Sequence, residues 1–189
     1  MGYSVLNSDI IAKEAYKKDS SIYNKLFGLI DSLKQKKILE ESETYLDSSM
    51  NIDTKKLIPY FIRYKNLLDD FESIIHPWVY ERFLNLATNY QNGEILFFES
   101  SLLVEINWYE RLHSLVLVSC NTDIRHQRLI QRGSQSVELS NFLESRQFSE
   151  EQKKKLCSYI IDSNCSMDEL KSQVKMLCLK IMDEINIKN

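Results

Sequence analysis

The sequence contains little glycine, proline and cysteine, and each shortage narrows the class of protein. Its 189 residues include four Gly, two Pro and four Cys. The cysteines show neither C-x-x-C spacing nor the density of a disulfide scaffold, so we expect reduced thiols and no zinc or other metal site. So little Gly and Pro is typical of a helix-rich globular chain without a low-complexity linker.

The chain also lacks a long apolar run, a leader-like start and a large charge of either sign. No apolar run approaches the roughly 20 residues of a membrane helix, and no basic segment followed by an apolar one opens the sequence. A net charge of -3 argues against a surface organised for nucleic acid. We therefore expect a cytoplasmic protein with small-molecule partners and with no membrane or nucleic-acid partner.

Short apolar runs alternate along the chain with stretches of helical spacing. We predict strands at residues 3–6, 95–98, 115–118 and 159–161. The run at 115–118 is the clearest, because parallel strands covered on both faces lose the alternating pattern. Strands alternating with helices predict an α/β fold with a parallel sheet and right-handed crossovers, built as one domain with an insertion.

Apolar residues at helical spacing predict the helices between these strands. They begin at Ile10 and continue over residues 21–39, 53–90, 123–132, 137–155 and 167–185. Pro77 disfavours the α conformation at His76, so two helices are predicted to meet at that position.

Asp9 lies at the carboxyl end of the first predicted strand, the edge at which open parallel sheets bind ligands. It could act as a general base or metal-linked carboxylate that faces a phosphoryl acceptor. It could equally be the N-cap of the helix that begins at Ile10, which is the commoner use of Asp at a strand-to-helix turn.

Basic and histidine side chains offer further candidates. Arg128 and Arg132 are four residues apart on one predicted helix, so both point to one face and could clamp phosphate oxygens. A solvated basic face is the alternative. His76 could bind substrate or serve as a structural donor. The three histidines have no carboxylate partners at ligand spacing, so we predict no metal centre.

In sequence order these segments resemble the dephospho-coenzyme A kinase family, over residues 2 to about 178. The first similar segment, 2–12, has a glycine, a short strand and a turn that ends in Asp9. Residues 101–105, Ser-Leu-Leu-Val-Glu, stand where the family has Pro-Leu-Leu-Phe-Glu. The other similar segments are Ile74-Ile75-His76-Pro77, Gln127-Arg128-Leu129 with Arg132, Gln147, and residues 159–164.

The resemblance implies an α/β P-loop kinase-like core with a parallel sheet, a helical insertion and a helical lid. The core would comprise residues 1–13 and 92–189, with the lid at about 126–157. Residues 14–91 would form the helical insertion that receives the substrate.

The resemblance also implies roles for particular residues. Asp9 would be the base for the 3'-hydroxyl of dephospho-CoA. Substrate would be bound by His76, Leu103 and Glu105. The lid would contact ATP and its phosphates through Gln127, Arg128 and Arg132. Dephospho-CoA and ATP would be the partners, with Mg²⁺ as the metal of the intact family.

The sequence departs from the family at several positions. The replaced positions are Asn7, Thr54, Ser101, Gly133, Ser158 and Ser163. In addition, no G-x-x-x-x-G-K-[ST] stretch, which would cradle the ATP phosphates, occurs in the 189 residues. In the family that stretch lies just upstream of the matched region, and its strand is central in the sheet. We therefore expect a core that lacks its first strand, between the strands at 95–98 and 115–118, and a chain inactive as a kinase.

Three interpretations follow. The chain is a truncated or mis-started form of a normal kinase, a coenzyme A-binding or regulatory remnant without kinase activity, or a helical protein-interaction module. The sequence leaves the oligomeric state open.

Overall fold

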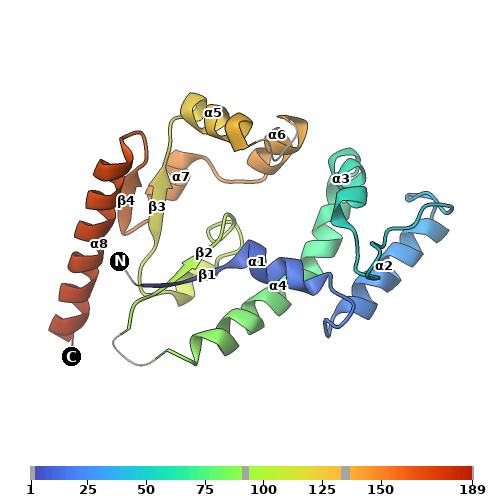
Figure 1. Ribbon diagram of the computed structural model, residues 1–189, viewed down its shortest axis with the longest axis horizontal. Helices are drawn as coiled ribbons and strands as arrows, with labels where there is room; N and C mark the ends of the chain where they lie inside the picture. The colour runs from blue at the N-terminus through green and yellow to red at the C-terminus, as the bar shows by residue number, and fades with distance from the viewer. Residues whose placement is uncertain (1–2, 91–93, 133–136, 189) are drawn as a thin grey trace. The chain divides into compact units, whose positions relative to one another are not determined.

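The computed structural model describes residues 3–90, 94–132 and 137–188 (Figure 1). The chain forms two compact units, one spanning Tyr3–Ser100 and the other beginning at Ser101. Each unit contains one pair of parallel strands and the helices that connect them. The predicted α/β class is confirmed, and all four predicted strands are present.

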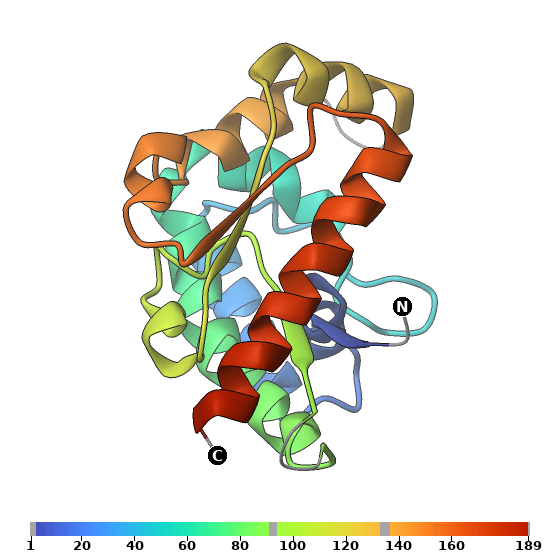
Figure 2. The same cartoon turned by 90° about the vertical axis from the view of Figure 1, so that its left-hand side faces the viewer.

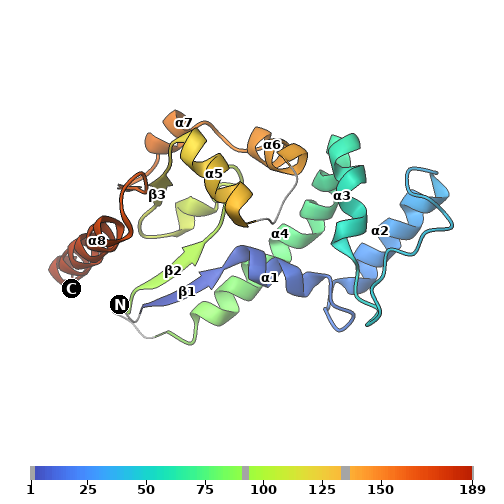
Figure 3. The same cartoon turned by 45° about the horizontal axis from the view of Figure 1, so that its top comes forward.

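The first unit begins and ends with a strand. Its elements are β1 (Ser4–Asn7), α1 (Ser8–Ala15), α2 (Tyr23–Gln35), α3 (Thr54–Arg63), α4 (Lys65–Ala87) and β2 (Leu96–Glu99). Strands β1 and β2 lie side by side and parallel, with Asn7 opposite Glu99 (Figure 3). Because the two strands end in register, their carboxyl ends form one edge, from which α1 begins.

Helix α4 provides the core of this unit. Its buried residues recur every four positions, which places them on one stripe that packs against α1, α2 and α3. They are Leu67, Phe71, Ile75, Val79 and Phe83. The ring of Phe83 stacks on Phe98 of β2, with 4.1 Å between the ring centroids. The apolar pattern of one long helix therefore connects the helical part of the unit to its strands.

The predicted helix junction at His76 and Pro77 is wrong. Helix α4 runs through both residues, and the break lies instead at Tyr64, with φ -121° and ψ 86°. Pro77 is exposed, on the side of the helix away from the buried stripe. Packing of that stripe on both sides of Pro77 outweighs the local preference of a residue that precedes proline.

The second unit contains the remaining elements. They are η1 (Trp108–Arg111), β3 (Val116–Ser119), α5 (Thr122–Arg132), α6 (Val137–Ser145), α7 (Glu150–Lys154), β4 (Tyr159–Asp162) and α8 (Met167–Lys188). Strands β3 and β4 are parallel and in register, and α8 packs along β4 (Figure 2). The helix predicted over 137–155 is two helices, because Ser149 caps α7 with its side chain.

The two strand pairs remain separate. In the part of the chain that the structure describes, β2 pairs with β1 alone and β3 with β4 alone. The absence of a central strand between the strands at 95–98 and 115–118 stays a prediction. The assignment of residues 14–91 to a substrate-binding insertion stays a prediction.

Candidate functional site

The carboxyl edge of β1 and β2 is organised by Asn7. The Oδ1 atom of Asn7 accepts a hydrogen bond from the backbone N–H of Ile10 at 3.0 Å, so Asn7 is the N-cap of α1. Its Nδ2 donates to Oε2 of Glu99 at 2.8 Å. The hypothesis that Asp9 caps this helix is therefore wrong, because the residue two positions earlier does so.

Asp9 is left available by this arrangement. It is an exposed residue in the first turn of α1, where the helix dipole favours a negative charge. Within residues 3–90, 94–132 and 137–188, no hydrogen bond or salt bridge occupies its carboxylate. An exposed carboxylate next to the strand edge is compatible with a proton acceptor, and that role of Asp9 stays a prediction.

Glu99 is a second carboxylate at the same edge, and the sequence interpretation overlooked it. It is exposed, and Asn7 is opposite it in the strand register. The only local signal was a charged residue directly after the apolar run 95–98. The partner that orients it is 92 residues away in sequence, so spacing alone could not identify it.

The carboxyl edge of β3 and β4 holds Arg128. Its Nη2 donates to the backbone oxygen of Ser163 at 2.8 Å, and its Nη1 lies 3.3 Å from Ser163 Oγ. Ser163 is buried, at 5% exposure, and its Oγ donates to the backbone oxygen of Ser119 at 2.8 Å. Arg128 is thus held at the strand ends by Ser163, and its predicted phosphate contact from the lid stays a prediction.

Ser119, the last residue of β3, also connects this edge to α7. Its Oγ donates to Oε1 of Glu150 at 2.7 Å, and Lys154 lies 2.9 Å from the same carboxylate. Hydrogen bonds from Lys154, the larger effect, and from Ser119 lower the pKa of Glu150 from its ordinary value of 4.5. The carboxylate is therefore ionised at neutral pH and keeps α7 at the end of β3.

Helix α5 carries the other predicted lid residues. Arg125 and His126 both contact the carboxylate of Glu144, which joins α5 to α6. Gln127 is exposed. Arg132 is the last residue of α5, and its side chain lies outside the described part of the structure. The predicted common face of Arg128 and Arg132 therefore stays a prediction.

Glu105 is nearly buried and used within the protein. Its Oε1 accepts from the backbone N–H of Phe148 at 2.7 Å and lies 3.1 Å from Lys153 Nζ. Lys153 also donates to Gln147 at 2.8 Å. The second oxygen, Oε2, is buried and has no hydrogen-bond partner among the described residues. The nearby Leu103 is buried at 8% exposure.

The predicted site residues divide between the two units. Asp9 and His76 belong to the first unit, with His76 half-buried in the middle of α4. The other predicted residues belong to the second unit: Leu103, Glu105, Gln127, Arg128 and Arg132. Each unit has side-chain hydrogen bonds at the carboxyl ends of its parallel strands, the edge at which open sheets bind ligands.

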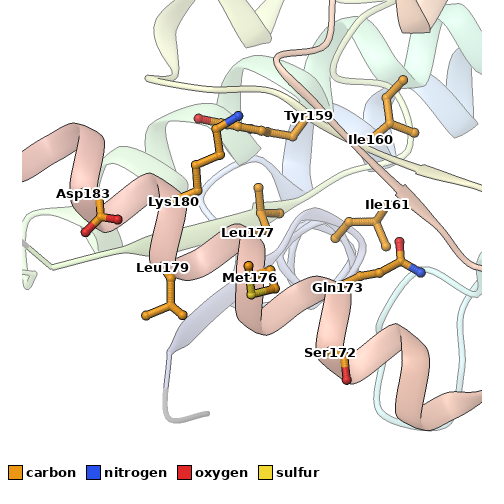
Figure 4. A pocket seen from close by; sticks show the side chains of 10 residues that line it. All are labelled: Tyr159, Ile160, Ile161, Ser172, Gln173, Met176, Leu177, Leu179, Lys180 and Asp183. Carbon is orange, nitrogen blue, oxygen red and sulfur yellow. The ribbon is translucent and has the colours of Figure 1, made fainter.

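A shallow groove lies elsewhere, between β4 and α8 (Figure 4). Its side chains are mostly apolar, and Lys180 lies over the ring of Tyr159 at 5.0 Å. None of the predicted site residues lines it.

The described residues contain neither a metal-binding cluster nor a membrane-spanning helix. Three or more His, Cys, Asp or Glu side chains do not gather anywhere among them as a metal site would require. Nor does any helix found there have the length and apolarity to cross a membrane.

Solved structures show which fold these units build. The protein TT1252 from Thermus thermophilus superposes with a TM-score of 0.67 at 23% identity, covering 95% of this chain and 85% of that one. A dephospho-CoA kinase from Campylobacter jejuni gives a TM-score of 0.65 at 20% identity, covering 97% and 87%. The chain has a P-loop kinase-like α/β fold.

Sequence comparison identifies the family as well as the fold. The model of the dephospho-CoA kinase family matches residues 1–169. The dephospho-CoA kinase of Aquifex aeolicus is 28% identical over 188 residues, which cover 98% of this chain and 86% of the relative. That of Gamma-proteobacterium EBAC31A08 is 26% identical over 187 residues, covering 98% and 88%. The chain belongs to the dephospho-CoA kinase family.

Proposed function

We propose that this chain supplies the acceptor side and the lid of an ATP-dependent dephospho-CoA kinase. Such an enzyme moves the γ-phosphoryl group of ATP to the 3'-hydroxyl of dephospho-CoA. One observation carries the assignment: Asn7 caps α1, and Asp9, beside the carboxyl edge of β1 and β2, has a carboxylate that no described residue contacts by a hydrogen bond or ion pair. A cytoplasmic location, where the four free cysteines would stay reduced, is part of the proposal.

In this reaction Asp9 accepts the proton of the 3'-hydroxyl as its oxygen attacks the γ-phosphorus. The new O–P bond forms while the bond from the γ-phosphorus to the bridging oxygen breaks, and ADP leaves with that oxygen. Phosphoryl transfer depends mainly on positioning and on charge stabilisation. Arg128 and Arg132, assisted by Gln127, would stabilise the phosphate charge from the lid. His76, Leu103 and Glu105 would shape the substrate side.

The 189 residues lack the motif that would bind ATP, the phosphate donor. The four glycines are Gly2, Gly28, Gly93 and Gly133, so no two have the spacing that G-x-x-x-x-G-K-[ST] requires. Kinases of this class bind Mg²⁺ through such a loop and an acidic residue. Because no described cluster fits a metal ion, we assign no residue to Mg²⁺. The 189-residue polypeptide should therefore bind dephospho-CoA while turning over ATP negligibly, which also suits a coenzyme A-binding role without kinase activity.

Calorimetry and a coupled ATPase assay test this proposal. Dephospho-CoA should bind the purified 189-residue polypeptide, and Asp9→Asn should weaken binding about 10-fold, because a hydrogen bond to a charged acceptor becomes one to a neutral amide. Asp31→Asn removes another exposed carboxylate, from α2, and should leave the affinity for dephospho-CoA unchanged. Absence of binding by the unmodified chain would overturn the acceptor-side assignment. Ordinary ATP turnover would overturn the donor-side one.

A further inference from the structure

The pair formed by Asn7 and Glu99 holds one carboxylate in a defined orientation. Both residues end their strands and are direct neighbours in the register of the sheet. Asn7 Nδ2 donates to Glu99 Oε2, and in the described chain no hydrogen bond reaches Glu99 Oε1. One oxygen of this exposed carboxylate is therefore held, and the other is available to a ligand.

The residue types suit this arrangement in a way that few others would. An Asn side chain can accept from the helix N–H and donate to a carboxylate at the same time. Aspartate at position 7 could still cap the helix, but it has no donor for Glu99, and two carboxylates in contact would repel each other. Position 7 thus determines where the carboxylate of Glu99 points.

We propose that Asn7 is a positioning residue and that Glu99 is a second substrate-contacting carboxylate of the acceptor site. Oε1 of Glu99 accepts a hydrogen bond from the 2'-hydroxyl of the ribose whose 3'-hydroxyl faces Asp9. Glu99 ends β2, and Asp9 lies two residues beyond the end of β1, the neighbouring strand about 4.8 Å away, so both carboxylates lie at the edge where one sugar ring would bind. This inference rests on the proposed function and adds selectivity for a ribonucleotide acceptor.

Moving the amide from position 7 to position 99, and the carboxylate from position 99 to position 7, tests the structural role of this pair separately from the charge of Glu99. Glu99→Gln keeps an oxygen that can accept from Asn7, so thermal stability should be unchanged. Asn7→Asp brings two carboxylates together and should lower the melting temperature. In the double variant N7D/E99Q the amide of Gln donates to the Asp carboxylate, and the melting temperature should recover. Recovery failing in the double variant would show that the contact does not stabilise the unit.

Binding is then measured by calorimetry with dephospho-CoA and with its 2'-deoxyribose analogue. E99Q should bind dephospho-CoA about 10-fold more weakly than the unmodified chain, and N7D/E99Q should stay weak although its stability has recovered. With the 2'-deoxy analogue, E99Q and the unmodified chain should bind alike. Glu41→Gln, which removes an exposed carboxylate from the same unit, is the control and should change neither measurement.

Three results would overturn the inference. If N7D/E99Q recovered its affinity for dephospho-CoA together with its thermal stability, the role of Glu99 would be purely structural. Equal affinity of E99Q and E41Q for dephospho-CoA would remove Glu99 from the acceptor site while leaving the proposed function intact. Failure of the unmodified chain to bind either ligand would refute the proposed function itself, and the role of Glu99 with it.

Discussion

The salt bridge between Glu105 and Lys153 gives a prediction whose magnitude follows from burial. The two side chains are 10% and 13% exposed, and they join the turn after β2 to α7. Replacing Lys153 with Met leaves a buried carboxylate whose second oxygen already has no partner among the described residues. Breaking a buried pair by removing one partner costs about 3–5 kcal/mol, and we expect about 3 kcal/mol because both groups keep some contact with solvent.

Urea denaturation followed by circular dichroism measures this loss. With a slope of about 2 kcal/mol per molar urea for a chain of this size, K153M should shift the unfolding midpoint down by about 1.5 M. The double variant E105Q/K153M should recover part of the loss, since the Gln oxygen still accepts from Phe148 and no charge remains buried.

Lys155→Met provides the matched control, because Lys155 is exposed at the end of the same helix. It should change stability by less than about 0.5 kcal/mol. A loss below about 1 kcal/mol in K153M would be that of a surface pair and would refute the reasoning from burial. An equal loss in the double variant and in K153M would show that the buried charge is not the cause.

Three further predictions concern stability. Pro77→Ala should raise the free energy of unfolding by about 1–3 kcal/mol, and the melting temperature with it, because α4 regains a backbone N–H; a lower melting temperature would contradict this reasoning. Phe71→Ala should cost about 3–5 kcal/mol in chemical denaturation, since the ring is 0% exposed; a cost below 1 kcal/mol would contradict this core. Glu150→Gln should be less stable than the unmodified chain at neutral pH. Because the folded pKa is lowered, the difference should vanish as pH falls below 4.5, whereas a pH-independent difference would exclude ionisation of Glu150 as its cause.

The strands were predictable from their apolar runs, but the burial predicted for the run at 115–118 was wrong, because Val118 of β3 is 61% exposed. Residues 115–118 form a continuous apolar run, and the structure places β3 at Val116–Ser119. Such runs are typical of parallel strands covered by helices. The alternation of strands and helices along the chain likewise predicted parallel pairing.

Predictions failed where a local preference competed with packing or with a neighbouring residue. The preference of the residue before Pro77 is weaker than the burial of Phe71, Ile75, Val79 and Phe83 along one helix. Asp9 was a reasonable cap by residue type, but the helix N–H of Ile10 donates to the side chain of Asn7 instead. Both alternatives satisfied the local rules, and only the three-dimensional arrangement distinguished them.

The contacts that organise the candidate site were beyond sequence reasoning for another reason. Glu99 finds its partner 92 residues away, and Glu150 finds Ser119 at a distance of 31 residues. Hydrogen bonds at such separations depend on how strands and helices are assembled. The family resemblance identified Asp9 and Arg128 as candidates, but it gave no indication that Ser163 holds Arg128 or that Asn7 holds Glu99.

The register of β1 with β2 has a consequence for the order in which the chain folds. Asn7 and Glu99 are 92 residues apart, whereas Ser119 and Ser163 are 44 apart. The entropic cost of closing the loop between β1 and β2 is about 0.6 kcal/mol higher. Formation of the helices between the two strands brings the strands closer together and so lowers this cost. We expect α1 to α4 to assemble early and the contact between Asn7 and Glu99 to form among the last in its unit. The backbone amides of β1 and β2 should therefore become protected from hydrogen exchange later than those of the helices.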